Sequence, residues 1–206
     1  MDTKTANGGA AAAALAGRKI ALGVTGSIAA YKACELVRLF VRAGAEVSVI
    51  MTAGAQQFVT PLTFRTLSRR SVATGLFDNP ETWVPGHVSL ALWCDALVIA
   101  PCTANVAAKL ACGIADDILS SIALACRKPI LLAPAMNEGM LDAPATRANF
   151  ATLRARGVAV MDCGEGELAC GVEGRGRMPE PPDVFRAVAE LFPPAAPAGP
   201  GAAPAP

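Results

Sequence analysis

Three side chains in this chain have the chemistry of a functional site, namely His87, Asn137 and Cys170. His87 is the only histidine and follows a glycine at the predicted start of a helix. Asn137 follows an apolar run ended by proline, so it lies where a buried strand should end, and its amide can both donate and accept hydrogen bonds. Cys170 lies in a glycine-rich segment that continues to Arg175 and Arg177, and arginine beside a thiol favours the thiolate and binds anions. These residue types suit the recognition of a carboxylate or another anion.

Each of the three residues also has a structural alternative. A lone histidine is more often a hydrogen-bonded structural residue than a catalyst. Asn137 could cap the helix that follows its strand, which is common for asparagine. Cys170 could be a chance cysteine in a mobile surface loop. The three residues taken alone leave these alternatives open.

A strand–turn–helix–strand unit is predicted at the start of the folded region. Residues 19–25 form a strand, Gly26 and Ser27 open a helix over 28–43, Gly44 ends that helix, and residues 46–51 form the next strand. Backbone N–H groups at the helix start, together with the Ser27 hydroxyl, suit an anion. The turn lacks the G-x-G-x-x-G spacing, and no acidic residue ends the second strand, so a mononucleotide phosphate fits better than a dinucleotide. A plain capping serine is the alternative.

Further strands and helices complete a single α/β domain with a doubly wound parallel sheet, of flavodoxin-like or Rossmann-like type, over residues 18–192. A strand at 96–100 ends at Pro101, and the polar turn Thr103–Ala104–Asn105 then opens a helix at 106–110. Asp116 and Asp117 are predicted to cap the next helix. The remaining predicted segments are a strand at 130–133, a helix at 144–156 ended by Gly157, a strand at 158–161, a lid-like loop at 163–181 too rich in glycine for regular structure, and a helix at 183–192.

Composition excludes several classes of protein. The net charge of +1 offers no electrostatic footprint for nucleic acid or an anionic membrane. The seven cysteines include no C-x-x-C pair, so we expect neither a disulfide framework nor a metal site, and most cysteines should be buried. Neither a signal peptide nor a run of membrane-spanning length is evident, which favours the cytoplasm. Residues 1–17, rich in glycine and alanine, and residues 193–206, rich in proline and alanine, are expected to be disordered tails.

Six co-linear motifs carry a resemblance to a known family. They are GSIAAYK (26–32), HVSLALWCD (87–95), PCTAN (101–105), GIADD (113–117), PAMN (134–137) and ACGVEGRGRM (169–178). In this order they resemble the homo-oligomeric flavin-containing cysteine decarboxylases. Within that family the chain is most similar to the phosphopantothenoylcysteine decarboxylases, and peptidyl-cysteine decarboxylases are close relatives.

The resemblance implies a flavodoxin-like fold, FMN bound at the contacts of a homotrimer, and often a dodecamer. It assigns His87, Asn137 and Cys170 as catalytic residues, with Asn137 reading the substrate carboxylate and amide. Met140, Arg175 and Arg177 are added as substrate-binding candidates. The candidates for FMN binding are Gly26, Ser27, Ile28, Thr52, Thr103, Ala104, Asn105, Val106, Ala135 and Met136.

The implied reaction is oxidative decarboxylation of a C-terminal cysteine. FMN takes two electrons from the cysteine CH–SH group, giving a thioaldehyde, so the carboxylate then lies β to an electron sink and leaves as CO₂. His87 would be the base or electrostatic partner of the thiolate. If the flavin returns its hydride and Cys170 supplies a proton, phosphopantothenoylcysteine is converted to 4′-phosphopantetheine, an intermediate of coenzyme A biosynthesis. A peptidyl-cysteine decarboxylase, the alternative, releases the enethiol.

Two features depart from the family pattern. Leu141 stands where the P-x-M-N-x-x-M-W motif has tryptophan, which concerns the shape of the substrate pocket. The coenzyme A enzyme is commonly fused to a synthetase, whereas this chain ends in the proline/alanine tail. A flavin prenyltransferase on the same fold would lack PAMN and the Cys170 segment, and a non-enzymatic regulator would not need His87, Asn137 and Cys170 together.

Overall fold

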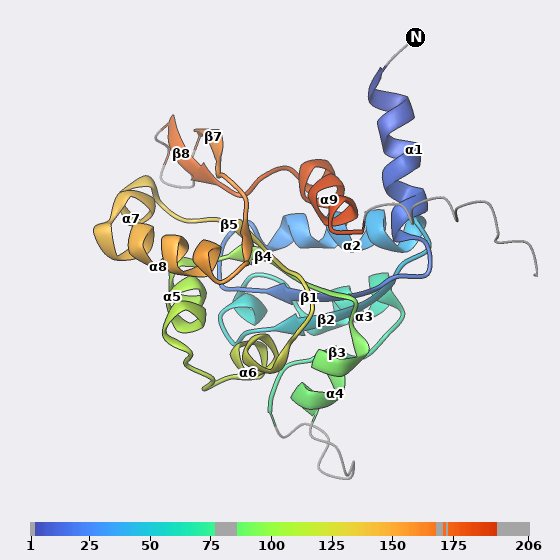
Figure 1. The fold of residues 1–206 in the computed structure, drawn as a ribbon, viewed down its shortest axis with the longest axis horizontal. Helices are drawn as coiled ribbons and strands as arrows, with labels where there is room; N and C mark the ends of the chain where they lie inside the picture. Colours follow the sequence, from blue (N-terminus) through green and yellow to red (C-terminus); the bar gives the residue numbers. More distant parts are fainter. Residues whose placement is uncertain (1–2, 77–85, 168–170, 172, 193–206) are drawn as a thin grey trace, which may run out of the picture.

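A six-stranded parallel sheet forms the centre of the computed structural model, which describes residues 3–76, 86–167, 171 and 173–192. The strand order is β3-β2-β1-β4-β5-β6 (Figure 1). From β1 the chain adds β2 and β3 on one side of the sheet, and then β4, β5 and β6 on the other side. The strand order therefore reverses between β1 and β4, and doubly wound sheets bind ligands at such a switch point. The predicted fold class is thereby confirmed. The strands are β1 (Lys19–Val24), β2 (Glu46–Met51), β3 (Val72–Ala73), β4 (Ala96–Cys102), β5 (Ile130–Pro134) and β6 (Ala159–Val160).

Helices cover both faces of the sheet, with α2 and α9 above it and α4 and α6 below it in Figure 1. Alternate residues of a strand point to opposite faces, so Ile20 and Leu22 pack on the α2 side while Ala21 packs on the α6 side. With both faces covered, the strands are almost wholly apolar. The helices are α1 (Thr3–Leu15), α2 (Ala30–Arg42), α3 (Pro61–Ser68), α4 (Gly86–Trp93), α5 (Ala104–Cys112), α6 (Ile118–Ala125), α7 (Glu138–Asp142), α8 (Pro144–Ala155) and α9 (Pro181–Glu190), with a short 3₁₀ helix η1 (Ala55–Gln57).

Several helix ends follow the predicted local signals. Gly44 and Gly157 have positive φ angles just beyond α2 and α8, as predicted from their type. Asp117 forms a capping box with Ser120 at the start of α6, which confirms its capping role. Lys109 pairs with both Asp116 and Asp117, and its hydrogen bond, with those from Ser120, outweighs burial to hold the pKa of Asp117 below its usual range. Most other boundaries differ from prediction by a few residues.

Two segments differ in kind from what the sequence indicated. Where a disordered tail was expected over residues 1–17, residues Thr3–Leu15 form α1, and its C-terminal end packs against α9 through Ala11 and Leu15. Alanine has the highest helix propensity, and this apolar contact completes the stabilisation of the segment. The glycine-rich loop expected at 163–181 contains an antiparallel hairpin, β7 (Gly164–Glu167) and β8 (Glu173–Arg177). The prediction of irregular structure there was wrong. Gly166 and Gly176 adopt positive φ angles within the strands, so glycine is compatible with this hairpin and does not exclude it.

No helix of the described ranges combines the length and the apolar character that a membrane crossing would need. The described cysteines are less buried than predicted. Cys94 and Cys102 are buried, Cys112 is exposed, and the side chains of Cys34, Cys126 and Cys163 are intermediate. The prediction that most cysteines are buried was therefore wrong for this part of the chain.

Candidate functional site

A row of hydrogen bonds links the turns at the carboxyl ends of the central strands. The Thr52 N–H donates to the carbonyl of Val24 (3.1 Å), which ties the end of β2 to β1. The Ala135 N–H donates to the carbonyl of Cys102 (3.0 Å), which ties β5 to β4. The edge therefore brings together the turns that carry the predicted cofactor-binding residues.

Thr25 joins β1 to β4 at the switch point and was not singled out in the sequence. Its fully buried hydroxyl donates to the carbonyl of Pro101 (2.7 Å) and accepts from the Thr103 N–H (3.1 Å). In the sequence, the only signal for Thr25 is its position directly before the Gly-Ser turn. That position does not reveal a partner 76 residues away. Thr25 thus positions the Thr103 turn relative to the Gly26 turn.

We expect Thr25→Val to lower the free energy of unfolding by about 1–3 kcal/mol, because it takes the hydroxyl away from the buried Pro101 carbonyl and from the part-buried Thr103 N–H. Urea unfolding measures this change. Thr25→Ser is the matched control, since it keeps the hydroxyl and loses only a methyl group. Equal stability of the valine and serine variants would contradict the role given to the hydroxyl.

The first turn packs closely against the turn after β2, and two glycines permit this approach. A Cβ on Gly26 would lie 3.1 Å from backbone atoms of Gly54, in the turn after β2. Gly26 is exposed, Ser27 is partly exposed, and the Ile28 side chain is 56% exposed. The Ser27 hydroxyl accepts from the Ala29 N–H (3.3 Å) within the turn, but the N-cap of α2 is Ala29 and no side chain caps this helix, so Ser27 is not the helix cap of the alternative interpretation.

The turn after β4 presents one capped and one exposed polar residue. Thr103 is the N-cap of α5, and its hydroxyl accepts from the Val106 N–H (3.4 Å). Ala104 is partly exposed, Asn105 is exposed and Val106 is buried. Asn105 is therefore the polar side chain of this turn that faces solvent, beside the switch point.

The turn after β5 shows that Asn137 is both a cap and an exposed amide. Its Oδ1 accepts from the Gly139 N–H (2.8 Å), so it caps α7. Ala135 is buried, Met136 is partly buried, and the Met140 side chain is 50% exposed. Because the cap uses the oxygen, the Nδ2 group of Asn137 is the donor that a ligand carboxylate can use.

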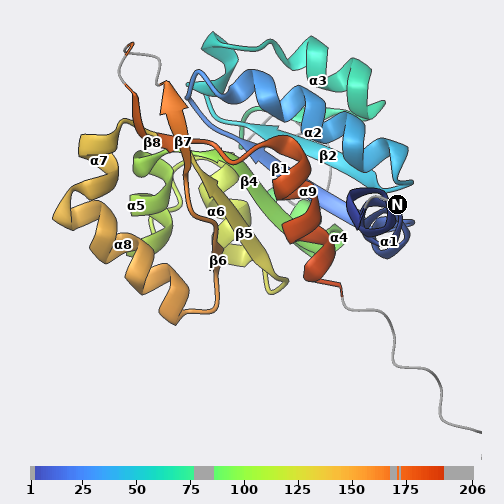
Figure 2. The ribbon, with the colours of Figure 1, turned by 90° about the horizontal axis from the view of Figure 1, so that it is seen from above.

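Strand β8 lies against this turn. The Met136 N–H donates to the carbonyl of Gly176 (3.0 Å), and a Cβ on Gly176 would collide with the Met136 carbonyl oxygen. The approach therefore requires glycine at 176. Figure 2 shows the β7–β8 hairpin beside α7. The hairpin holds Met136, and hence the corner that carries Asn137.

Arg175 on β8 points toward α7. Its Nε lies 3.3 Å from Glu138 Oε1, and its NH2 lies 2.8 Å from Asp142 Oδ2. A hydrogen bond from Arg147, together with Arg175, holds the pKa of Asp142 below its usual value. Arg177 instead lies 3.5 Å from Glu180. The two arginines predicted to bind substrate thus both make ion pairs within the chain.

Lys32, in the first motif, anchors the chain after β8. Its side chain is 8% exposed, and its Nζ donates to Glu180 (2.7 Å) and to the carbonyl of Met178 (3.4 Å). This role was not predicted, although Lys32 is the one charged residue in the stretch from Ile28 to Cys34. Lys32 ties α2 to the segment between β8 and α9, which sets the position of the hairpin.

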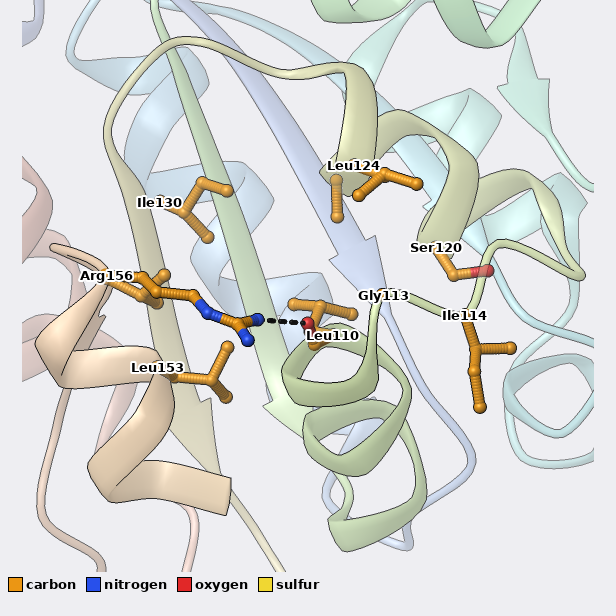
Figure 3. Close-up of a pocket in the computed structure, with 10 residues that line it drawn as sticks. Leu110, Gly113, Ile114, Ser120, Leu124, Ile130, Leu153 and Arg156 are labelled. Atoms are coloured by element: carbon orange, nitrogen blue, oxygen red, sulfur yellow. Dashed lines mark hydrogen bonds between the residues drawn. The ribbon is translucent and has the colours of Figure 1, made fainter. Parts of the chain in front are cut away.

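A groove of about 530 Å³ runs between β8, α7 and α8, next to the Asn137 turn. Its charged lining is balanced, since Arg147 and Arg175 face Asp142 and Arg154 faces Asp162. Cys163 also lines it, and burial raises the pKa of this thiol to about 11. A smaller cavity of about 150 Å³ is lined by Leu110, Ile130, Leu153 and Arg156, at the start of β5 and therefore at the opposite edge of the sheet (Figure 3).

His87 is not brought to Asn137 within one chain. It lies in the first turn of α4, which packs on α6 and β1, whereas α7 packs on α8 and β8. Figures 1 and 2 both show α4 and α7 far apart. The Nδ1 atom of His87 is buried and has no hydrogen-bond partner among the described residues. Cys170 lies outside the described residues, so its predicted role stays a prediction.

The edge fits a ligand that combines a planar ring with an anionic group. Gly26 and Ile28 are exposed in the first turn, and Tyr31 and Met140 also present exposed apolar side chains. Exposed amides at Asn105 and Asn137 supply polar contacts. Flavin mononucleotide has this combination of ring and phosphate.

Comparison with known proteins identifies the family. Residues 10–192 match the Flavoprotein family. The chain is 46% identical over 178 residues to the coenzyme A biosynthesis bifunctional protein CoaBC of Haemophilus influenzae, covering 86% of this chain and 44% of that protein. The chain thus spans less than half the length of this relative.

Two solved structures share the fold over nearly their whole length. One is a PPC decarboxylase mutant complexed with pantothenoylaminoethenethiol (TM-score 0.78, 30% identity, 85% of this chain and 98% of that chain). The other is the FMN-dependent cysteine decarboxylase SpaF (TM-score 0.72, 30% identity, 85% of this chain and 99% of that chain). Together with the family match over most of the sequence, they show that this chain belongs to the flavoprotein family.

Proposed function

We propose that this chain is an FMN-dependent decarboxylase that acts on the C-terminal carboxylate of a cysteine. The observation that carries the proposal is the Asn137 corner, an exposed amide donor at the end of β5 held in place by β8. The similarity to CoaBC over 86% of the chain supports phosphopantothenoylcysteine as the substrate, with 4′-phosphopantetheine as the product, in coenzyme A biosynthesis. The enzyme class is a carboxy-lyase.

The turns at the carboxyl edge would hold FMN. The Gly26–Ser27–Ile28 turn would take the phosphate, since Gly26 and Ile28 are exposed there, and Thr52 lies at the neighbouring strand end. The Thr103–Val106 turn and Ala135 with Met136 would contact the ring. When bound, FMN supplies a two-electron acceptor for oxidation of the cysteine.

The chain's own residues would bind the substrate and handle its protons. The Nδ2 group of Asn137 would donate to the substrate carboxylate and hold it beside the ring. Met140, half exposed one turn along α7, would contact the apolar part of the substrate. His87 would take the proton of the substrate thiol or stabilise the thiolate, and Cys170 would return a proton to the product.

A second copy of the chain would complete the site. His87 and Asn137 lie on helices far apart in one subunit, so one subunit alone does not combine base and carboxylate donor (Figure 1). A ring of subunits would bring the His87 turn of one copy to the Asn137 turn of its neighbour. The expected assembly is a homotrimer, with a dodecamer of four trimers as the larger form.

Arg175→Gln tests how the hairpin supports Asn137. Loss of the ion pairs to Glu138 and Asp142 should let α7 shift, which we expect to raise KM roughly three- to tenfold with little change in kcat. The measurement compares phosphopantothenoylcysteine with pantothenoylcysteine, which lacks the phosphate. A positioning role raises KM equally for both. Direct binding of the phosphate by Arg175 raises it for the first alone.

Mass spectrometry of products from the purified flavoprotein tests the function itself. Loss of about 44 mass units (CO₂) from phosphopantothenoylcysteine is the expected result. Loss of about 46 (CO₂ and two hydrogens) from a peptide ending in cysteine alone would instead identify a peptidyl-cysteine decarboxylase that releases an enethiol. This alternative is supported by the similarity to SpaF. No loss from either substrate, with FMN bound, would overturn the decarboxylase and favour a regulator or a prenyltransferase.

A further inference from the structure

Two thiols that play no part in the proposed reaction face each other below the sheet. Cys94 directly follows α4, and Cys126 directly follows α6, and these two helices pack together. Their sulfur atoms are 4.0 Å apart. Cys94 is 1% exposed, whereas Cys126 is partly exposed. One sulfur of the pair is thus reachable from solvent, and the other lies directly behind it.

The surroundings of the pair favour one thiolate and one thiol. A hydrogen bond from Cys94 and the neighbouring Lys128 lower the pKa of the Cys126 thiol below its usual value, against the opposing effect of burial. The hydrogen bond with Cys126 and burial raise the pKa of Cys94, which keeps its proton. Cys126 is the partly exposed thiol and the one whose pKa is lowered, so it is the sulfur that a disulfide in solution can reach, and the buried Cys94 sulfur is placed to resolve what forms on it.

We propose that Cys94 and Cys126 are a redox modification site, which closes to a reversible disulfide by exchange with a small disulfide such as glutathione disulfide. The Cys126 thiolate attacks the glutathione disulfide, forms a mixed disulfide and releases one glutathione thiolate. The Cys94 sulfur, on losing its proton, attacks Cys126 Sγ and releases the second glutathione thiolate. In balance, two protein thiols are oxidised and one glutathione disulfide is reduced to two glutathione thiols.

The bond requires little movement. The sulfur atoms must approach by about 2 Å to reach the disulfide length, within the reach of side-chain rotation at two element ends. The cross-link joins the end of α4 to the end of α6 and encloses β4, α5 and α6. It should raise the midpoint of thermal unfolding by roughly 5–10 °C, because it restricts the unfolded chain. It also fixes α4, whose first turn carries His87.

The test uses the flavin-loaded protein, incubated with glutathione disulfide, then alkylated in denaturant and digested with trypsin. Cys94 lies in tryptic peptide 71–109 and Cys126 in peptide 110–127. Each peptide holds one further cysteine, Cys102 and Cys112, so variants must identify the bond. Cys94→Ala and Cys126→Ala should abolish the link between the two peptides. Cys112→Ala, which removes the exposed thiol, should leave it intact.

A link that survives in Cys112→Ala, disappears in Cys94→Ala and is reversed by dithiothreitol is the expected result. The rise in thermal midpoint should appear and disappear with it. Glutathione attached to Cys126 without a link to Cys94 would overturn the proposal, and so would complete alkylation of both cysteines after oxidation. Neither outcome depends on decarboxylase activity, so the proposed function is tested separately.

Discussion

His87→Asn is expected to lower kcat about 10²- to 10⁴-fold while FMN stays bound, which is the range lost with a positioned acid–base group. Asparagine can put a polar atom near the position of the buried Nδ1, so the fold should tolerate the change. It cannot carry a proton to or from the substrate thiol. Product formation under saturating substrate, with flavin absorbance as the control for loading, measures the effect. An unchanged kcat would show that His87 is structural.

The same variant tests whether the site lies between subunits. Co-expression with Asn137→Asp gives mixed oligomers in which each chain lacks one of the two groups. If each site takes His87 from one subunit and Asn137 from the next, random mixing restores about a quarter of the sites. If one subunit supplies both residues, no site is restored and the mixture stays inactive. The distance between α4 and α7 in one chain leads us to expect recovery.

Asn137→Asp is expected to reduce kcat/KM roughly 10²- to 10³-fold without loss of stability. The structure makes this substitution selective, because an aspartate oxygen can still accept from the Gly139 N–H and cap α7. What it removes is the Nδ2 donor, and it sets a negative charge against the substrate carboxylate. Steady-state kinetics and thermal unfolding of the same preparation measure the two properties.

Asn137→Ser separates the charge from the lost donor. Serine also caps helices, and it is neutral, so its loss in kcat/KM should be smaller than that of the aspartate variant. Wild-type kcat/KM in Asn137→Asp would show that the amide does not touch the carboxylate. A fall in thermal midpoint in Asn137→Asp would show that the cap, and not the donor, is the main role of this residue.

Local signals in the sequence predicted most of the sheet and helices. The apolar runs at 19–25, 46–51 and 130–133 are strands, because a parallel sheet covered on both faces needs continuous apolar segments. Gly44, Gly157 and Asp117 mark helix ends, because capping depends on neighbouring residues alone. The turns at Gly26, Thr103 and Asn137 lie at one edge, since parallel strands all end there.

The same local signals failed where the neighbours are distant in sequence. The alanine-rich start is a helix because α9 supplies the surface on which Leu15 is buried. The glycine-rich segment is a hairpin because β7 and β8 pair with each other and β8 lies against Met136, and only glycine permits that approach. Composition alone does not reveal either partner.

The sequence by itself determined the fold class, the family and the residue types at the edge of the sheet, because these follow from short-range patterns and co-linear motifs. The tertiary structure alone decided how those residues are used. It joined Thr25 to Thr103, committed one end of the Asn137 amide to a cap, turned Arg175 toward α7 and set Cys94 beside Cys126. It also separated His87 from Asn137 within one chain. Contacts between residues far apart in the chain depend on how the helices and strands pack, and no local sequence pattern specifies that packing.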